Sequence, residues 1–202
     1  MCDEEKSPWQ TVSSKVVYDN PWIRVREDAV IRPDKEPGIY GVVHYKNTAI
    51  GILAVEGEDI YLVGQYRYTL GQYSWEIPEG GCAEGEEHLA AAKRELEEET
   101  GLQAKRWTKL GEAHLSNSVS DELAVWYLAT DLIKGVQQPE GTEQLIIRRV
   151  PVIEALQMAL TGKITDAISL MAIFQYHLLS GGRWQRALPK KTNPKTKKAA
   201  RP

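Results

Sequence analysis

The chain has 202 residues, 42% of them hydrophobic, and this length and composition fit one globular domain with a sizeable core instead of two full domains. The formal net charge of −3 excludes the strongly basic field of a dedicated nucleic-acid-binding protein. Cys2 and Cys82 are too few for a disulfide framework or a cysteine-based zinc site.

The first third of the sequence is expected to be rich in β-strands. Short runs of β-branched and aromatic residues follow one another between Ser13 and Tyr66, separated by turn-forming segments such as 33–38. We expect residues 1–12 to form a flexible N-terminus and residues 13–31 to form an N-terminal strand extension of the domain.

A helix is expected between Glu86 and Thr100, where the composition changes to the good helix formers Ala, Leu, Glu, Lys and Arg. Gly101 follows as a stop signal. The central part of the chain therefore changes from strands to one helix.

Strand-like segments return at 107–114, 123–129 and 145–150. Two helices are then expected to close the domain, and Pro151 suits the first position of the earlier one.

The ends of these two helices are also marked by sequence signals. Gly162 is expected to end the first helix, and Thr165 or Asp166 to cap the second. A strand-rich sheet with a central helix and terminal helices predicts an α/β fold, an α/β/α sandwich whose sheet is covered on both faces. We assign this domain to residues 13–182.

The two ends of the chain bear on localisation. The tail 183–202 is basic, with Lys and Arg crowded among Pro and Thr in its last thirteen residues, and we expect it to be disordered. The first ten residues are acidic and lack the order of a secretory signal, and no later stretch is long enough to cross a bilayer. A cytoplasmic protein with no membrane attachment is expected.

One segment, from Gly80 to Leu102, contains a pattern that points to chemistry: G-x5-E-x7-R-E-U-x-E-E-x-G-U, where U is a bulky apolar residue. Glu95, Glu98 and Glu99 stand at i, i+3 and i+4, so they project from one helix face and repel one another unless cations neutralise them. Carboxylates at this density suit Mg²⁺, with Mn²⁺ as an alternative. The competing interpretation is a solvated surface stripe, which is the usual role of a Glu-rich helix.

The loop before this helix favours the functional interpretation. Its glycines, Gly80, Gly81 and Gly85, allow a sharp turn that brings backbone carbonyls close to a bound metal. Glu86 and Arg94 are too far apart to pair along one helix, but they can pair if Glu86 lies in the loop.

This spacing matches the Nudix box at every specified position, so the chain resembles the Nudix hydrolases. Beyond the box, residues 65–67 and 75–80 are similar to the Q-x-R and W-E-x-P-x-G elements of the subgroup that contains ADP-ribose pyrophosphatases and nucleoside diphosphate sugar hydrolases. The resemblance extends from about Ser13 to Leu179. It implies a Nudix sandwich built on a mixed β-sheet.

The resemblance also implies a role for several residues of the box. Glu95, Glu98, Glu99 and the Glu79 carbonyl would hold two or three Mg²⁺ ions. Glu98 is assigned to the catalytic group, and Arg94 supports it by bracing the loop against the helix together with Glu86.

Further roles follow from the elements outside the box. Arg67 would contact the substrate phosphates, for which its planar fork is suited, and Glu76 would contact the ribose or the second sugar. Glu140 would be the general base and Glu143 a metal ligand, on the late loop 139–143. For either glutamate, a plain surface position in a turn is an equal alternative.

Two departures from the subgroup pull in opposite directions. Residues 114–122 replace a Pro-containing loop typical of ADP-ribose pyrophosphatases, which favours other sugar nucleotides. Residues 166–168 lack the Lys that some sugar-nucleotide hydrolases have two positions after the Asp, and this absence favours ADP-ribose over other sugar nucleotides. The choice between ADP-ribose and GDP-mannose type substrates stays open at the level of sequence.

A homodimer is expected, because the N-terminal block 13–31 resembles the segment that pairs subunits in this subgroup. Two strands alone are marginal in water and need a partner surface. Tyr18 and Trp22 in this block could stack on the nucleobase across the subunit boundary, although such aromatic residues more often belong to a core or an interface.

The expected function is Mg²⁺-dependent hydrolysis of the diphosphate bond of a nucleoside diphosphate sugar, giving a nucleoside monophosphate and a sugar phosphate. Hydrolysis of nucleoside triphosphates or RNA 5′ ends is the alternative within the enzyme class. A non-catalytic nucleotide sensor is the alternative outside it, and the intact glutamates argue against it. The small-molecule substrate and a second subunit are the expected partners, and a nucleic acid is not.

Overall fold

Two β-sheets and three helices make up the part of the chain that the computed structural model describes, residues 6–135 and 144–181. The N-terminal sheet consists of β1 (Gln10–Asp19), β2 (Ile23–Ile31) and β3 (Pro37–Tyr45). The larger sheet consists of β4 (Thr48–Glu56), β5 (Asp59–Arg67), β6 (Gln72–Glu76), β7 (Glu79–Cys82), β8 (Leu102–His114), β9 (Leu123–Lys134) and β10 (Ile146–Pro151). The helices are α1 (His88–Thr100), α2 (Val152–Leu160) and α3 (Ala167–Leu179).

The larger sheet is mixed, as expected. Its strand order is β10-β5-β4-β9-β8, with β6 paired to β5 and β7 paired to β4. The central pair β4 and β9 is parallel, with Ile50 beside Val125 and Leu53 beside Leu128, and the other paired strands of this sheet are antiparallel. The short strands β6 and β7 lie in a stretch for which the sequence predicted no strands.

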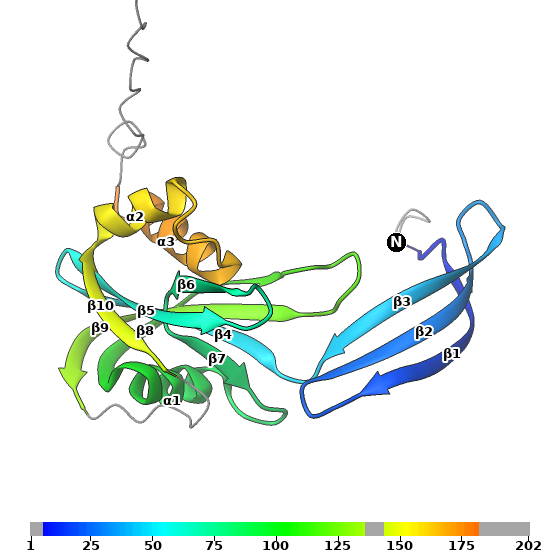
Figure 1. Ribbon diagram of the computed structural model, residues 1–202, viewed down its shortest axis with the longest axis horizontal. Coiled ribbons are helices and arrows are strands. Elements are labelled where there is room, and N and C mark those ends of the chain that lie inside the picture. Colours follow the sequence, from blue (N-terminus) through cyan, green and yellow to red (C-terminus); the bar gives the residue numbers. More distant parts are fainter. Residues whose placement is uncertain (1–5, 136–143, 182–202) are drawn as a thin grey trace, which may run out of the picture.

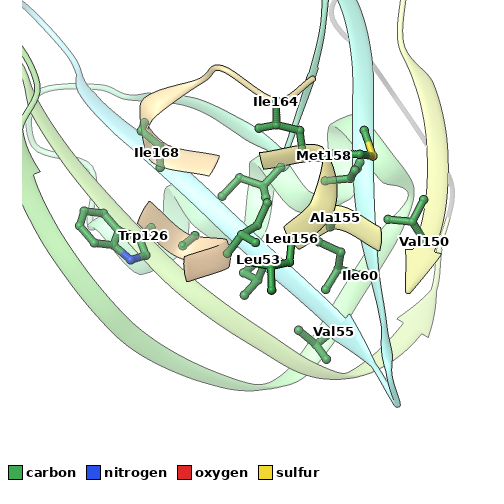
Figure 2. Close-up of a cluster of buried hydrophobic side chains, with 14 of the residues drawn as sticks. Leu53, Val55, Ile60, Trp126, Val150, Ala155, Leu156, Met158, Ile164 and Ile168 are labelled. Carbon is green, nitrogen blue, oxygen red and sulfur yellow. The ribbon is translucent and has the colours of Figure 1, made fainter. Parts of the chain in front are cut away.

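Strand β4 shows why helices cover both faces of the sheet. Its apolar run has no polar face, so side chains pointing in both directions must be buried. Leu53 and Val55 point into a cluster with α2 and α3, where Figure 2 shows Leu53 beside Leu156. Ile50 and Ile52 point the other way, into a cluster with α1. Helix α1 therefore lies on one face and α2 and α3 on the other, the expected sandwich (Figure 1).

The helix boundaries follow the expected signals with small shifts. Helix α1 ends where Gly101 adopts a φ of 66° and donates its N–H to Glu97 O at 2.8 Å. Pro151 lies one position before the first residue of α2, as its N-cap. Of the two expected caps of α3, Asp166 is the one used, accepting a hydrogen bond from Ser169 N at 2.7 Å.

The N-terminal sheet extends sideways from the larger sheet (Figure 1). Every residue of β1 is exposed, and the strand begins at Gln10, inside the stretch 1–12 that was expected to be flexible. The sheet also includes β3 and so continues beyond residue 31. Residues 183–202, the expected tail, lie outside the described residues.

The β8–β9 loop ties this sheet to the rest of the domain. Val43 N donates to Val119 O at 2.8 Å, and the side chain of Asp121 accepts a hydrogen bond from Tyr45 N at 3.0 Å. Nδ1 of His44 lies 2.6 Å from the same carboxylate. Within the described ranges, none of the helices has the length and apolar character needed to cross a membrane.

Candidate active site

A cavity of about 730 Å³ lies at the C-terminal end of β5, beside α1 and the start of α3. Its lining brings together five residues that the sequence singled out: Trp22, Arg67, Glu79, Arg94 and Glu95. These residues come from four separate parts of the chain, so the site is assembled by the fold. We call this cavity the cleft.

Helix α1 contributes the three carboxylates of the sequence pattern, and they have two kinds of neighbour. Glu95 and Glu98 each accept a hydrogen bond from Nη1 of Arg94, at 2.7 and 2.9 Å. Glu99 is only 1% exposed and accepts a hydrogen bond from Glu79 N at 2.9 Å. The buried Glu99 thereby connects α1 to the start of β7.

Arg94 is the centre of this arrangement. Besides the two helix carboxylates, its Nη2 donates to Gly81 O at 2.9 Å, and Nε and Nη2 each lie 3.2 Å from an oxygen of Glu86. Glu86 precedes the first residue of α1, the loop position in which a pair with Arg94 was expected. One guanidinium thus joins the loop to the helix and offsets the repulsion between neighbouring carboxylates.

Gly80 lies directly against the Glu95 side chain. A Cβ atom built on Gly80 would overlap the carboxylate of Glu95, so no other residue type fits without displacing that group. The glycine is therefore explained here by its close approach to the Glu95 side chain.

We expect Gly80→Ala to lower kcat/KM by about tenfold or more, because the added methyl group must push the Glu95 carboxylate out of place. Steady-state kinetics on the preferred substrate gives the measurement. Gly41→Ala is the matched control, since a Cβ atom there meets nothing within 4 Å. Equal activity of the two variants would contradict the proposed importance of this contact.

Arg67 forms the second charged cluster of the cleft. Its Nε lies 3.0 Å from both carboxylate oxygens of Glu76, and its Nη2 also binds Glu79. Glu76 is 2% exposed, and a buried carboxylate is costly without such a partner. The predicted substrate-binding residues Arg67 and Glu76 are thus in direct contact with each other.

Glu79 faces a markedly acidic environment. Burial raises the pKa of its carboxyl well above the ordinary range, and the charges of Asp166 and Glu76 raise this pKa further. Its Oε2 atom is buried, with no hydrogen-bond partner among the described residues. A bound donor or cation at this oxygen would stabilise the charged carboxylate.

The lining includes residues whose part in the site the sequence did not reveal: Tyr45, Asn47, Glu122 and Asp166. The sequence marked Asp166 only as a helix cap and as part of a departure from the subgroup. None of the four belongs to a local spacing pattern that could have indicated a site.

The two N-terminal aromatic residues are placed differently. Trp22 lines the cleft with 68% of its surface exposed, and its carbonyl accepts a hydrogen bond from Lys46 N at 3.0 Å. Tyr18 is also exposed but is not part of the lining. Glu140 and Glu143 lie outside the described residues.

The donors of the cleft fit a divalent cation. Five lining carboxylates stand against two arginines: Glu79, Glu86, Glu95, Glu122 and Asp166 against Arg67 and Arg94. An anionic substrate would be repelled by this lining unless cations accompanied it. Among the described residues, no three His, Cys, Asp or Glu side chains are grouped to hold a metal by themselves.

Comparison with known families agrees with this geometry. Residues 45–170 match the NUDIX domain, which covers more than half of the chain. The chain belongs to the NUDIX family. Residues 9–43 match the N-terminal domain of nucleoside diphosphate sugar hydrolases, and this region spans almost all of the N-terminal sheet.

Two bacterial relatives and one solved structure are similar over most of their length. The chain is 33% identical to an ADP-ribose pyrophosphatase of Mycobacterium tuberculosis over 180 residues, which is 86% of each chain. It is 29% identical to an ADP-ribose pyrophosphatase of Bacillus subtilis over 81% of this chain and 90% of the relative. The crystal structure of an ADP compounds hydrolase superposes with a TM-score of 0.77 at 20% identity, covering 89% of this chain and 97% of the other.

These matches confirm two expectations. The superposition confirms the Nudix-type α/β sandwich. The domain and its relatives identify this NUDIX protein as a hydrolase of the pyrophosphatase class, and such hydrolases generally depend on a divalent metal.

Proposed function

We propose that this NUDIX hydrolase splits the diphosphate bond of a nucleoside diphosphate sugar in the presence of Mg²⁺, giving a nucleoside monophosphate and a sugar phosphate. The main observation is the cleft itself, in which Glu95, Arg94 and Arg67 line a space of about 730 Å³. Glu98 and Glu99 do not line it but are joined to lining residues, Glu98 to Arg94 and Glu99 to Glu79 N. Relatives named ADP-ribose pyrophosphatase support ADP-ribose as the first substrate to test. GDP-mannose remains the alternative on the basis of the 114–122 segment.

In this proposal, Glu95, Glu98, Glu99 and the Glu79 carbonyl hold Mg²⁺, or Mn²⁺ in its place. When bound, the cations neutralise the phosphates and act as Lewis acids. Arg94 keeps the carboxylates oriented through the contacts described above. The ion pairs of Arg67 with Glu76 and Glu79 fix the Arg67 guanidinium, so that its remaining donor capacity can position a phosphate oxygen.

The reaction is a substitution by water at one phosphorus of the P–O–P linkage. The oxygen of water forms the new P–O bond, the bridging P–O bond breaks, and the other phosphate leaves. We assign the removal of the water proton to Glu140 and a metal contact to Glu143, both from their positions in the sequence. Glu76 would hold a sugar hydroxyl, either of the ribose or of the second sugar.

A substrate panel tests the proposed activity directly. Purified protein with Mg²⁺ is given ADP-ribose, GDP-mannose, ATP and a 5′-triphosphorylated RNA, and phosphate is measured after phosphatase treatment with controls that contain no enzyme. We expect kcat/KM to be largest for a nucleoside diphosphate sugar. A clear preference for ATP or for the RNA would overturn the proposal in favour of the corresponding pyrophosphohydrolase. Binding without turnover of any of the four would favour a sensor.

We also propose that the protein is a homodimer that pairs through its N-terminal sheet. Strand β1 leaves apolar side chains on the surface, among them Val12, Val16 and Val17, each more than half exposed. A partner surface would remove these groups from water, and a two-fold axis would cover the same surface on both subunits. Light scattering at micromolar concentration should give twice the monomer mass of 22.7 kDa, and a monomer mass in an active sample would refute the dimer.

If the dimer forms, we expect Trp22→Ala to raise KM by several-fold while changing kcat less, because Trp22 lines the cleft and would bind the base instead of reacting. Tyr18→Ala is the comparison. Tyr18 does not line the cleft of its own chain, so a similar rise in KM would require Tyr18 to reach the cleft of the partner subunit. Subunits with Trp22→Ala are then mixed with subunits with Glu99→Gln. Recovered activity after subunit exchange shows that the site draws on both chains, and no recovery places Trp22 in its own chain's site.

A further inference from the structure

The cleft lining includes two carboxylates that do not belong to the α1 cluster. Glu122 comes from the end of the β8–β9 loop, and Asp166 is the cap of α3. Burial raises the pKa of the Glu122 carboxyl, and the charge of Asp166 raises this pKa further, so the two groups lie within electrostatic reach. Neither residue has a place in the metal-binding pattern of the sequence.

Neither of these two carboxylates forms a direct ion pair with a Lys, Arg or His side chain of the described residues. Glu122 is half-buried, and within this part of the chain its carboxylate makes no hydrogen bond or ion pair. Asp166 accepts one hydrogen bond, from Ser169 N. The guanidinium of Arg67 pairs directly with Glu76 and Glu79, and it interacts with Asp166 only through charge, without a direct contact.

Such a pair of carboxylates selects a ligand by hydrogen-bond type and by charge. Ionised carboxylates only accept hydrogen bonds, so a ligand group that satisfies them must donate. Sugar hydroxyls donate and are neutral. A phosphate only accepts at neutral pH and is repelled by carboxylates that no cation screens.

We infer that Glu122 and Asp166 bind hydroxyl groups of the sugar moiety and exclude a terminal phosphate, and so select nucleoside diphosphate sugars over nucleoside triphosphates. This inference rests on the proposed function and adds the residues that set its specificity. It assigns Asp166 a second role beyond capping α3.

The test compares the kcat/KM ratio of ADP-ribose to ATP in the wild type, Glu122→Gln and Asp166→Asn, all with Mg²⁺. Gln and Asn keep the size of each side chain and remove its charge, and Asn can still cap α3. We expect kcat/KM for ADP-ribose to fall by about tenfold or more in each variant, because each variant loses one charged hydrogen bond to the substrate. For ATP we expect no fall or a rise, because a repulsive charge has been removed.

Controls separate this specificity from general damage. Glu112→Gln removes a carboxylate that pairs with Lys109 on the surface and does not line the cleft, so its ratio should equal that of the wild type. Thermal unfolding checks the fold of each variant. Asp166→Ser replaces Asp166→Asn if the latter unfolds, since Ser is also a good N-cap without charge.

The outcomes distinguish the two levels of the proposal. A wild type that hydrolyses ADP-ribose well, together with unchanged ratios in both folded variants, overturns only the roles of Glu122 and Asp166. A wild type that prefers ATP overturns the proposed function and this inference together. A shifted ratio in both folded variants, with Glu112→Gln unchanged, supports the inference.

Discussion

Glu98→Gln and Glu99→Gln should each lower kcat by about a hundredfold or more, with Mg²⁺ at saturation. Each change removes one negative charge from the face of α1 that is proposed to hold the cations, and so removes charge compensation from the transition state. The fold should survive both changes. Glu99 is buried and accepts a hydrogen bond from Glu79 N, and the amide oxygen of Gln can still accept it.

Glu97→Gln is the matched control, because Glu97 lies on the same helix but accepts a hydrogen bond from Gln103 Nε2 of β8, at 2.7 Å, and has no contact with Arg94 or Glu79 among the hydrogen bonds described above. Its kcat should stay within about twofold of the wild type. Metal titration of the two site variants by calorimetry adds an independent readout, with weaker Mg²⁺ binding expected. Near-normal kcat in both site variants would remove the basis for a metal site on this face.

Arg94→Lys should be nearly as damaging, with kcat/KM lower by about a hundredfold. Lys keeps the positive charge, but one ammonium group cannot replace the fork that reaches Gly81 O, Glu86, Glu95 and Glu98 together. The loop would then lose its connection to the helix and the carboxylates their fixed orientation. We also expect a lower melting temperature, because several partly buried hydrogen bonds are lost.

Arg106→Lys provides the comparison for a surface arginine. The Arg106 side chain is 72% exposed and pairs with Asp131 through one contact of 2.9 Å, so this change should affect neither activity nor stability measurably. If Arg94→Lys behaved like Arg106→Lys, Arg94 would have to be treated as an ordinary surface charge. Circular dichroism on both variants separates loss of activity from loss of fold.

The charge distribution of the cleft is the reason that we expect a single substitution there to have a large effect. Each arginine is shared among several carboxylates, so removing one partner changes the environment of the others. Effects at Arg94 and at the α1 glutamates should therefore be non-additive. The surface pairs used as controls lack this coupling.

The sequence by itself determined helix α1 and the family. Local spacing decides which residues share a helix face, so the sequence alone is enough to group Glu95, Glu98 and Glu99. The composition of residues 86–100 and the glycine that follows predicted the helix to within two residues of its observed start. The strand-like runs, together with the central helix and the two terminal helices, were enough to predict the layered architecture.

Only the tertiary structure decided what else lines the cleft. The hydrogen bonds of the β8–β9 loop to β3 bring Tyr45 and Glu122 to the cleft, although 77 positions separate them in the sequence. The same fold places Trp22 in the lining and leaves Tyr18 outside it, a difference that their sequence positions did not reveal. Helix periodicity is a local property of the chain, whereas these neighbours depend on strand pairing and loop docking between distant segments, which no local spacing encodes.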